Sequence, residues 1–496
     1  MSENTTSNGT EQKSAFTDTP LWKVIMWPFA ESGRILFLML MMFLSFYATG
    51  IAGIGVVLVG TIITGTRIFD GITDPLMGMF IDKTQGKFGK VRPFAIGGYI
   101  AMVGFAFLIF FTTHHIPEGF RLVYFIVIYA LYMLAYSTMG MAIAVGNPVI
   151  TKNPKQRPVI FGTSMIVNLA IGAGFAMYVA NVAPRHGGFS AVSMFHEILI
   201  TFTILSAILF TLGLIAIWKY DRIENFTSGK RQKVTLKDMF GVLKGNRALQ
   251  MFVATNVSDR LANNVANAQV VNVMLFGIII GDFAIMGTIQ GVMLIPNIIT
   301  LLIGVRLIGK IGAKKAYLIS IWAAMAFTVM LVSLLFFGDP TLISFERIGF
   351  MTIAFVVLNF GFSVTRLLSQ VSVGPMRPDI IDYETYRTGN FAPGIIVAAD
   401  SFIDKMVVAF YQTLIAVTVA SIGFTEVLPD LDTPLTNSIF WVTMFLGFGI
   451  LLITWVISLI CMKFYPLDAK KMVEVQTELK KRAEEASAAT TEQSLS

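Results

Sequence analysis

Long apolar segments constrain this chain more than any other feature of its sequence. Each segment extends over roughly 20 residues or more, the length that a helix needs to cross a membrane. Hydrophobic residues make up 55% of the 496 positions and charged residues only 14%, whereas a soluble protein carries about a quarter charged residues. The composition excludes a soluble enzyme, a disordered scaffold and a fibrous protein, and it predicts an all-α membrane protein.

The apolar segments form two sets of six separated by a polar stretch. They lie near 35–54, 56–80, 93–113, 121–146, 159–183 and 196–218, and near 248–277, 282–304, 316–337, 346–373, 391–421 and 437–464. We therefore predict an N-terminal segment over 1–33, a six-helix half over 34–218, a middle loop over 219–247, a second half over 248–465 and a short, charged, disordered tail over 466–496. Basic glycine turns at 86–90 and 309–315 occupy equivalent places in the halves and favour a duplicated transporter, although such turns recur in many membrane proteins.

The basic residues predict the orientation of the chain. On the twelve-span map, 30 of the 37 Lys and Arg residues fall on the side of both termini and the middle loop, and only Arg121, Arg185 and Arg347 fall on the other side. Cytoplasmic loops carry this excess, so we place both termini in the cytoplasm and the chain in a bacterial-type inner or plasma membrane. The net charge of +7 then serves orientation and lipid headgroups, not nucleic acid. A single cysteine excludes a disulfide framework.

Five carboxylates fall well inside the predicted spans: Asp70, Asp74, Asp259, Asp400 and Asp404. A charge at the centre of a bilayer costs about 2.5–3.5 kcal/mol on insertion scales. Such a residue persists when it faces a watery cavity, pairs with an opposite charge or binds an ion. Each of the five is therefore a candidate functional residue.

Asp70 and Asp74 lie four residues apart and share one face of the second predicted span. Two carboxylates one turn apart repel each other, and a bound Na⁺ or Li⁺, or a proton on one of them, would remove that repulsion. The Thr73 hydroxyl could add another oxygen ligand. The alternative is a structural ion pair with Arg67, which would neutralise only one carboxylate, so we favour a cation site.

The eleventh predicted span carries a second acidic pair, Asp400 and Asp404, followed by Lys405. Lys405 could donate hydrogen bonds to a polyol, or it could join the two halves by pairing with Asp70 or Asp74. A salt bridge within the eleventh span is the alternative. We favour a functional role and assign these three residues to a substrate site.

The seventh predicted span is the most polar of the twelve, and amides suit hydroxyl-rich ligands because they both donate and accept hydrogen bonds. It carries Asn256, Ser258, Asp259, Arg260, Asn263, Asn264, Asn267 and Gln269. We assign Asp259, Arg260 and Asn264 to the substrate site, although these side chains could equally hold helices together. Arg366 in the tenth span could face the cavity or the cytoplasmic vestibule. No glycine-rich phosphate loop is present, so we expect no ATP-driven pump, no enzyme and no cofactor.

Two long motifs resemble those of the glycoside–pentoside–hexuronide:cation symporters, the melibiose permease-like branch of the major facilitator superfamily. The first extends over 67–78 and continues through 82–84 and 89–93, and the second covers 378–387. Lys405 then falls where this family has a lysine in its eleventh span. The resemblance implies twelve helices in two pseudo-symmetric halves, and it covers essentially the whole helical body.

The resemblance also implies roles for individual residues. Asp70 and Asp74 match the cation-site aspartates of the family, with Thr73 between them, and Ser137 falls where members offer a hydroxyl from the fourth span. Disaccharide-transporting relatives carry an acidic residue at the position of Gly140, a tryptophan at Ala144 and an arginine at Ser164, so their galactoside clamp is largely missing here. The loops 82–92 and 376–389 are expected to latch the gate through charge pairs. The gating residues are Arg67, Arg92, Arg366, Asp379, Asp382 and Glu384.

We therefore predict a secondary transporter that moves a sugar or glycoside together with Na⁺, Li⁺ or H⁺ by alternating access. Its expected partners are the small-molecule sugar and the membrane lipids, with no obligate protein partner. One alternative is a cation-coupled carrier of an anionic hexuronide or an amphiphile, whose acidic group Arg260, Arg366 and Lys405 could bind. A second alternative is a sugar sensor that does not transport.

Overall fold

Membrane-length helices form the body of the protein in this computed structural model, which describes residues 19–84, 88–151, 156–222, 236–389 and 393–495. Within that part of the chain, 11 helical spans are long and apolar enough to cross a membrane, and two helices that meet at a 51° bend form a further one. Strands are absent from the described ranges. The prediction of an all-α, twelve-span fold is confirmed.

The N-terminal half contains the first six spans. Their elements are α1 (Leu21–Met26), α2 (Pro28–Met41), α3 (Leu44–Phe46), η1 (Tyr47–Ile51), α4 (Val56–Lys83), α5 (Arg92–Thr112), η2 (Thr113–His115), α6 (Glu118–Ile150), α7 (Arg157–Arg185) and α8 (Val192–Ile217). The elements from α1 to η1 together make one span, Leu21–Ile51.

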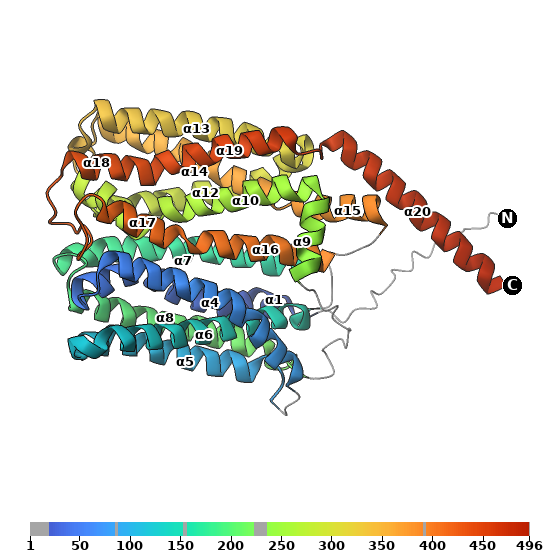
Figure 1. Ribbon diagram of the computed structural model, residues 1–496, viewed down its shortest axis with the longest axis horizontal. Coiled ribbons are helices and arrows are strands. Elements are labelled where there is room, and N and C mark those ends of the chain that lie inside the picture. Colours follow the sequence, from blue (N-terminus) through green and yellow to red (C-terminus); the bar gives the residue numbers. More distant parts are fainter. Residues whose placement is uncertain (1–18, 85–87, 152–155, 223–235, 390–392, 496) are drawn as a thin grey trace, which may run out of the picture.

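The C-terminal half contains the other six spans and three additional helices. Its elements are α9 (Leu236–Gly245), α10 (Arg247–Ala266), α11 (Gln269–Asn272), η4 (Val273–Ile279), α12 (Ala284–Ile311), α13 (Ala313–Phe337), η5 (Pro340–Leu342), α14 (Phe350–Val373), α15 (Met376–Thr388), α16 (Pro393–Ala409), α17 (Tyr411–Ala420), α18 (Asn437–Met444), η6 (Phe445–Gly449), α19 (Ile450–Phe464) and α20 (Ala469–Leu495). The bent span consists of α10, α11 and η4, and α9, α15 and α20 gather at one end of the bundle (Figure 1).

The first span begins earlier than the sequence prediction placed it. Helix α1 starts at Leu21, so the predicted boundary at residue 34 falls inside α2. The prediction missed this turn because it contains a lysine. The Lys23 ammonium lies 4.9 Å from the centre of the Tyr220 ring, and this cation–π contact lets a charged residue occupy a buried position.

The tail is a helix, and the prediction of a disordered tail is wrong for 469–495. Asp468 accepts a hydrogen bond of 2.8 Å from the Lys471 N–H, which caps α20 and lowers the pKa of the Asp468 carboxyl. Further along the helix, Arg482 pairs with Glu478 at 3.0 Å. Charge pairs at this spacing support a solvated helix, and the prediction gave too little weight to them.

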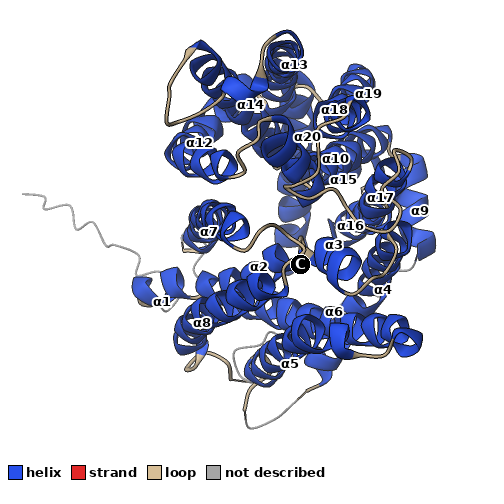
Figure 2. Cartoon of the chain, turned by 90° about the vertical axis from the view of Figure 1, so that its left-hand side faces the viewer, coloured by secondary structure: helices blue, strands red, loops and turns tan. Residues whose placement is uncertain are grey.

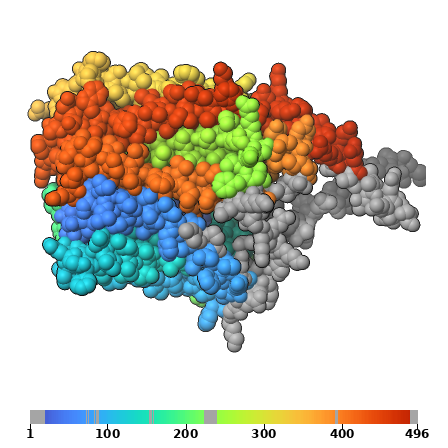
Figure 3. Space-filling model, viewed as in Figure 1, coloured from blue at the N-terminus to red at the C-terminus, as the bar shows by residue number. Residues whose placement is uncertain are grey.

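The two halves lie side by side, with the N-terminal half blue to green and the C-terminal half green to red (Figures 1 and 3). Along one flank α4 packs against α16 and α17, and α7 packs against α12. Figure 2 shows α7 lying between the two groups of helices. A Cβ atom on Gly60 would come within 2.6 Å of Ala416, and one on Gly287 within 2.7 Å of Ala180. These glycines therefore permit the close approach of the halves.

A clasp between loops closes the bundle at the end opposite α9, α15 and α20. We define this clasp as Asp430 in the loop after α17 and the residues 188–190 between α7 and α8. The Asp430 carboxylate accepts hydrogen bonds from the backbone N–H groups of Phe189 and Ser190, each at 3.0 Å, and from the Ser190 hydroxyl at 2.8 Å. Gly188 has a φ of 107°, and its missing Cβ leaves room for that carboxylate. The halves are thus tied together at this end.

Candidate functional site

Asp70 and Asp74 of α4 converge on one hydroxyl of α6. The Ser137 oxygen contacts an oxygen of Asp70 and lies 2.5 Å from Oδ1 of Asp74. A hydroxyl has a single hydrogen, so it donates to only one of these carboxylates at a time. The second carboxylate needs a proton or a cation of its own. The two aspartates and Ser137 that the sequence singled out therefore meet at one point.

Lys405 reaches this point from the other half of the molecule. Its ammonium contacts Oδ2 of Asp74, so α16 is tied to α4 beside the acidic pair. Of the alternatives that the sequence left open, the geometry matches the bridge between halves and not a salt bridge within the eleventh span. Figure 3 shows the α4 and α16 segments in contact along the flank of the molecule.

Thr73 and Arg67, which lie close to the acidic pair in sequence, make no hydrogen bond to its carboxylates in the part of the chain that the structure describes. The buried Thr73 hydroxyl donates to the backbone carbonyl of Asp70 at 3.2 Å, so it is used by its own helix. Arg67 has a buried Nε without a hydrogen-bond partner. Within the described ranges it makes no ion pair with Asp70, so the proposed structural ion pair is absent there.

The second acidic pair is held within the C-terminal half. Asp400 accepts hydrogen bonds from Arg377 at 2.5 Å and from Asn256 at 3.2 Å. Asp404 accepts one from Arg260 at 2.7 Å. Asp400 and Asp404 are therefore counter-ions of arginines on neighbouring helices. The sequence missed Arg377 as a site residue because a residue just beyond a predicted span was counted with the cytoplasmic loop.

The polar side chains of α10 are also held by hydrogen bonds within the protein. Asp259 accepts a hydrogen bond of 2.9 Å from the indole N–H of Trp455, and the Asn264 amide donates to the carbonyl of Arg260 at 2.7 Å. Asn263 accepts a hydrogen bond of 2.5 Å from Nε of Arg366. The sequence gave no signal for Trp455, since tryptophan in an apolar span is usually a packing residue.

Two adjoining cavities lie against this polar face. One has a volume of about 500 Å³ and is lined by Asp259, Arg260, Asn264, Arg377 and Gln370, among other residues. The other has a volume of about 340 Å³ and also reaches Gln370. Both are bounded from the N-terminal half by α7. Together they provide a water-accessible space between the halves at the depth of the membrane.

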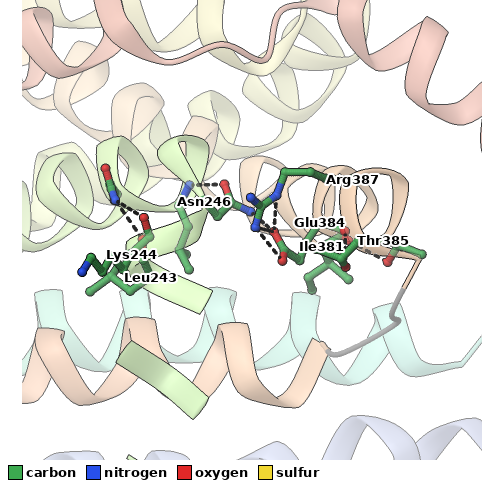
Figure 4. Close-up of polar contacts among 10 residues, drawn as sticks. Leu243, Lys244, Asn246, Ile381, Glu384, Thr385 and Arg387 are labelled. Atoms are coloured by element: carbon green, nitrogen blue, oxygen red, sulfur yellow. Dashed lines mark hydrogen bonds and ion pairs between the residues drawn. The ribbon is translucent and has the colours of Figure 1, made fainter. Parts of the chain in front are cut away.

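The predicted gating residues lie apart from one another in this conformation. Arg92 bonds to Asp221 at 3.2 Å, which lies just after α8, the last span of the same half. Glu384 pairs with Arg387 at 3.0 Å and accepts from Asn246 at 2.7 Å, joining α15 to the start of α10 (Figure 4).

The remaining gating predictions are not met by contacts in this conformation. For Asp379 and Asp382, the described part of the chain contains no ion-pair partner. Arg366 lies deep beside Asn263. Residues 85–87 of the first loop lie outside the described residues, so the charge latch between the loops stays a prediction.

Comparisons with known proteins identify the family to which this chain belongs. A family model described as "MFS/sugar transport protein" matches residues 33–469. The chain is 24% identical over 388 residues to the putative glycoside/cation symporter YagG of Escherichia coli (strain K12), covering 77% of this chain and 79% of that protein. It is 24% identical over 452 residues to the glucuronide carrier protein homolog of the same organism, covering 89% and 91%.

Among solved structures, the chain is similar to a bacterial homolog of the human lysosomal transporter Spinster in an inward-facing, unoccupied conformation. The TM-score is 0.57 at 11% sequence identity, and the match covers 94% of this chain and 99% of that one. At this identity the similarity shows the fold alone.

Proposed function

The chain belongs to the MFS/sugar transport protein family, in its glycoside–pentoside–hexuronide:cation symporter-like branch, and on that premise we propose that it moves a sugar or glycoside across the membrane together with a cation. Transport proceeds by alternating access, in which the two halves rock around a central cavity. No covalent chemistry is part of this function.

The observation that carries the proposal is the contact of Lys405 with the carboxylate pair of α4. The contact joins the halves at the place where two carboxylates share one hydroxyl. A proton, Na⁺ or Li⁺ at Asp70 and Asp74 would compete with the ammonium and release α16 from α4. Cation binding and the relation of the halves are then linked, as symport requires, and the linkage is reciprocal.

We assign the residues of the site as follows. Asp70, Asp74 and Ser137 hold the cation, and Thr73 joins them only if its hydroxyl turns away from the carbonyl of Asp70. The substrate faces the polar residues of α10 and α16. The gating role assigned from the motifs requires a second conformation, in which the open end of the bundle closes.

We also propose that the protein lies in a bacterial-type cytoplasmic membrane with both termini in the cytoplasm. Support comes from the 30 of 37 Lys and Arg residues on that side of the twelve-span map. In this orientation the Asp430 clasp lies outside, and the cavities open toward the cytoplasm. A membrane potential of 100 mV then contributes about 2.3 kcal/mol per charge, enough for a sugar gradient of more than tenfold.

Uptake into proteoliposomes tests the function. Labelled pentosides, glucosides and uronides are offered with a Na⁺ gradient, with a proton gradient and with neither. We expect accumulation with one gradient and only equilibration without it, and the effective gradient identifies the ion. Accumulation that ignores both gradients would contradict symport. Ligand binding without counterflow would identify a sensor instead.

A second candidate substrate is an anionic hexuronide. Three arginines, Arg260, Arg366 and Arg377, line the cavities, and one relative is named as a glucuronide carrier protein homolog. An arginine fork binds a carboxylate in a bidentate manner. Competition between neutral and acidic sugars distinguishes this candidate from a neutral glycoside.

A further inference from the structure

The smaller of the two cavities has the chemistry of a sugar-ring site. Its volume of about 340 Å³ falls in the range of small-molecule pockets, about 300–1,000 Å³. Its walls combine the aromatic rings of Phe276, Phe362 and Phe448 with several amide side chains. Rings pack against the C–H faces of a sugar, and amides bond to its hydroxyls in either direction.

Two of these amides have no partner in the protein. Gln290 of α12 and Asn359 of α14 line the cavity from different helices, and within the described ranges neither side chain forms a hydrogen bond. Gln290 is exposed and Asn359 is half-buried, so both amides face open space, where water or a ligand can satisfy their hydrogen bonds. By contrast, Asn297 in the same wall bonds to Ser363 at 3.1 Å. Gln290 and Asn359 are therefore free to bind a ligand.

In the N-terminal half, Arg34 covers the position of Gly140. Arg34 forms an ion pair with Glu31 and stacks on Tyr136 with its guanidinium carbon 4.1 Å from the ring centre. A Cβ atom on Gly140 would come within 3.1 Å of that guanidinium. The position at which disaccharide-transporting relatives carry an acid is thus covered by an arginine that already has a counter-ion.

The arginines of the larger cavity are paired with carboxylates of the protein. Arg260 pairs with Asp404 and Arg377 with Asp400, while Nε of Arg366 in the smaller cavity donates to Asn263 at 2.5 Å. An anionic ligand at Arg260 or Arg377 would have to displace one of these carboxylates and leave it unpaired, which is costly in a partly dehydrated site. A neutral ligand needs no such displacement.

We propose that the ring of a neutral sugar or glycoside binds in the C-terminal half, in the cavity bounded by α12 and α14, with its hydroxyls on Gln290 and Asn359. The larger cavity, which adjoins at Gln370, receives the aglycone or a second ring. This inference rests on the proposed transport function and adds the place and the charge of its substrate. Specificity then depends on the amides of the C-terminal half and not on the arginines.

Isosteric variants test the place at which the sugar ring binds. Gln290→Met and Asn359→Leu keep the volume and remove the hydrogen bonds, so each is expected to raise KM for a neutral glycoside roughly two- to twelvefold, the value of one neutral hydrogen bond. Asn181→Leu is the matched control, because that exposed amide donates only to the Met177 carbonyl of its own helix. An unchanged KM in both cavity variants would overturn the proposal. If an apolar variant does not reach the membrane, Gln290→Asn and Asn359→Gln displace the amide and are expected to raise KM as well.

Neutral and acidic methyl glycosides test the charge of the substrate. Methyl β-glucoside, methyl β-galactoside and methyl β-xyloside are compared with methyl β-glucuronide in proteoliposomes that carry the effective cation gradient. We expect a neutral glycoside to be accumulated and to have a KM at least tenfold below that of the glucuronide. Accumulation of the glucuronide alone would overturn the inference and leave symport standing. Movement of none of the probes with any gradient would count against both.

Discussion

At the scale of single residues, the shared hydroxyl of Ser137 limits what the acidic pair can do. Asp70 and Asp74 lie on one face of α4, and only one of them takes the Ser137 hydrogen at a time. The other charge is balanced from across the molecule by Lys405. The resting state therefore places an ammonium where the transported cation is expected.

Asp74→Asn is the sharpest test of this arrangement. The amide keeps the shape and removes one charge, so a cation no longer gains two carboxylates. We expect the accumulation ratio of the sugar to fall from more than tenfold to about one, while counterflow without a gradient persists. Uptake and counterflow in proteoliposomes measure both. Asp339→Asn is the control, since Asp339 caps a short exposed turn by accepting from the Thr341 N–H at 3.0 Å. Gradient-dependent accumulation in Asp74→Asn would exclude this cation site.

Lys405→Met removes the internal competitor. The Lys405 ammonium occupies the carboxylate that a cation would bind, so its loss is expected to lower the half-activating concentration of Na⁺ or H⁺ by about tenfold, which corresponds to about 1.4 kcal/mol. Cation titrations of sugar uptake or exchange give this value directly. Lys405→Arg keeps the charge and should stay close to the parent. A weaker response to the cation in Lys405→Met would show that the lysine binds substrate and does not replace the ion.

At the scale of helices, the sequence predicts what depends on local pattern. Hydropathy located the spans, and the spacing of Asp70 and Asp74 placed them on one face, because both properties follow from helix geometry alone. The partners of Asp400 and Asp404 could not be assigned in this way. Arg377 and Arg260 reach them only after α10, α15 and α16 have packed together.

The Asp430 clasp could not be predicted from the sequence for the same reason. Asp430 is one of several acidic residues in a loop, and nothing in its neighbourhood indicates that its partners are backbone N–H groups of the other half. The positive φ of Gly188 that makes room for it is likewise a property of the folded loop. Contacts between loops of this kind leave no periodic pattern in the sequence.

Asp430→Asn is expected to loosen the closed end. Charge-assisted hydrogen bonds are stronger than neutral ones, and a loss of about 1.4 kcal/mol changes the ratio of the two conformations about tenfold. In a Cys461→Ser background with Ala416→Cys, a buried position of α17 where the halves meet at Gly60, labelling by an impermeant maleimide from the side of the clasp should become about ten times faster. Asp432→Asn, a change at an exposed neighbour, is the control. Equal labelling rates in the two variants would mean that the clasp does not hold the end closed.

At the scale of the whole molecule, one end of the bundle is tied by the clasp and the flanks are joined along α4 and α7. The cavities lie between those flanks and adjoin the end that carries α9, α15 and α20. Alternating access requires the joined end of the bundle to open while the other end closes. The charge pairs at the gate are internal to each half in this conformation, as expected of an open end. The loops 82–92 and 376–389 would then form charge pairs with each other only in the opposite conformation.

Cross-linking across the opening tests this exchange. Met165 of α7 and Val373 of α14 line the larger cavity from opposite halves, so in a Cys461→Ser background Met165→Cys with Val373→Cys presents one thiol on each wall. A flexible bis-maleimide that joins them prevents the opening from closing, and we expect uptake to fall by more than tenfold. Leu367→Cys with Val373→Cys is the matched pair, because both of its thiols lie on α14 in the C-terminal half and move together.

The same pair of cysteines also tests the coupling between the cation and the sugar. If cation and sugar together favour closure of the opening, adding both should change the rate of cross-linking between Met165→Cys and Val373→Cys more than either does alone, since symport requires the two ligands to favour the same conformation. The rate within the C-terminal half should remain constant. A cross-linked protein that still accumulates sugar would mean that the halves do not move as rigid bodies about this cavity, and transport would then need a path other than the one between α7 and α14.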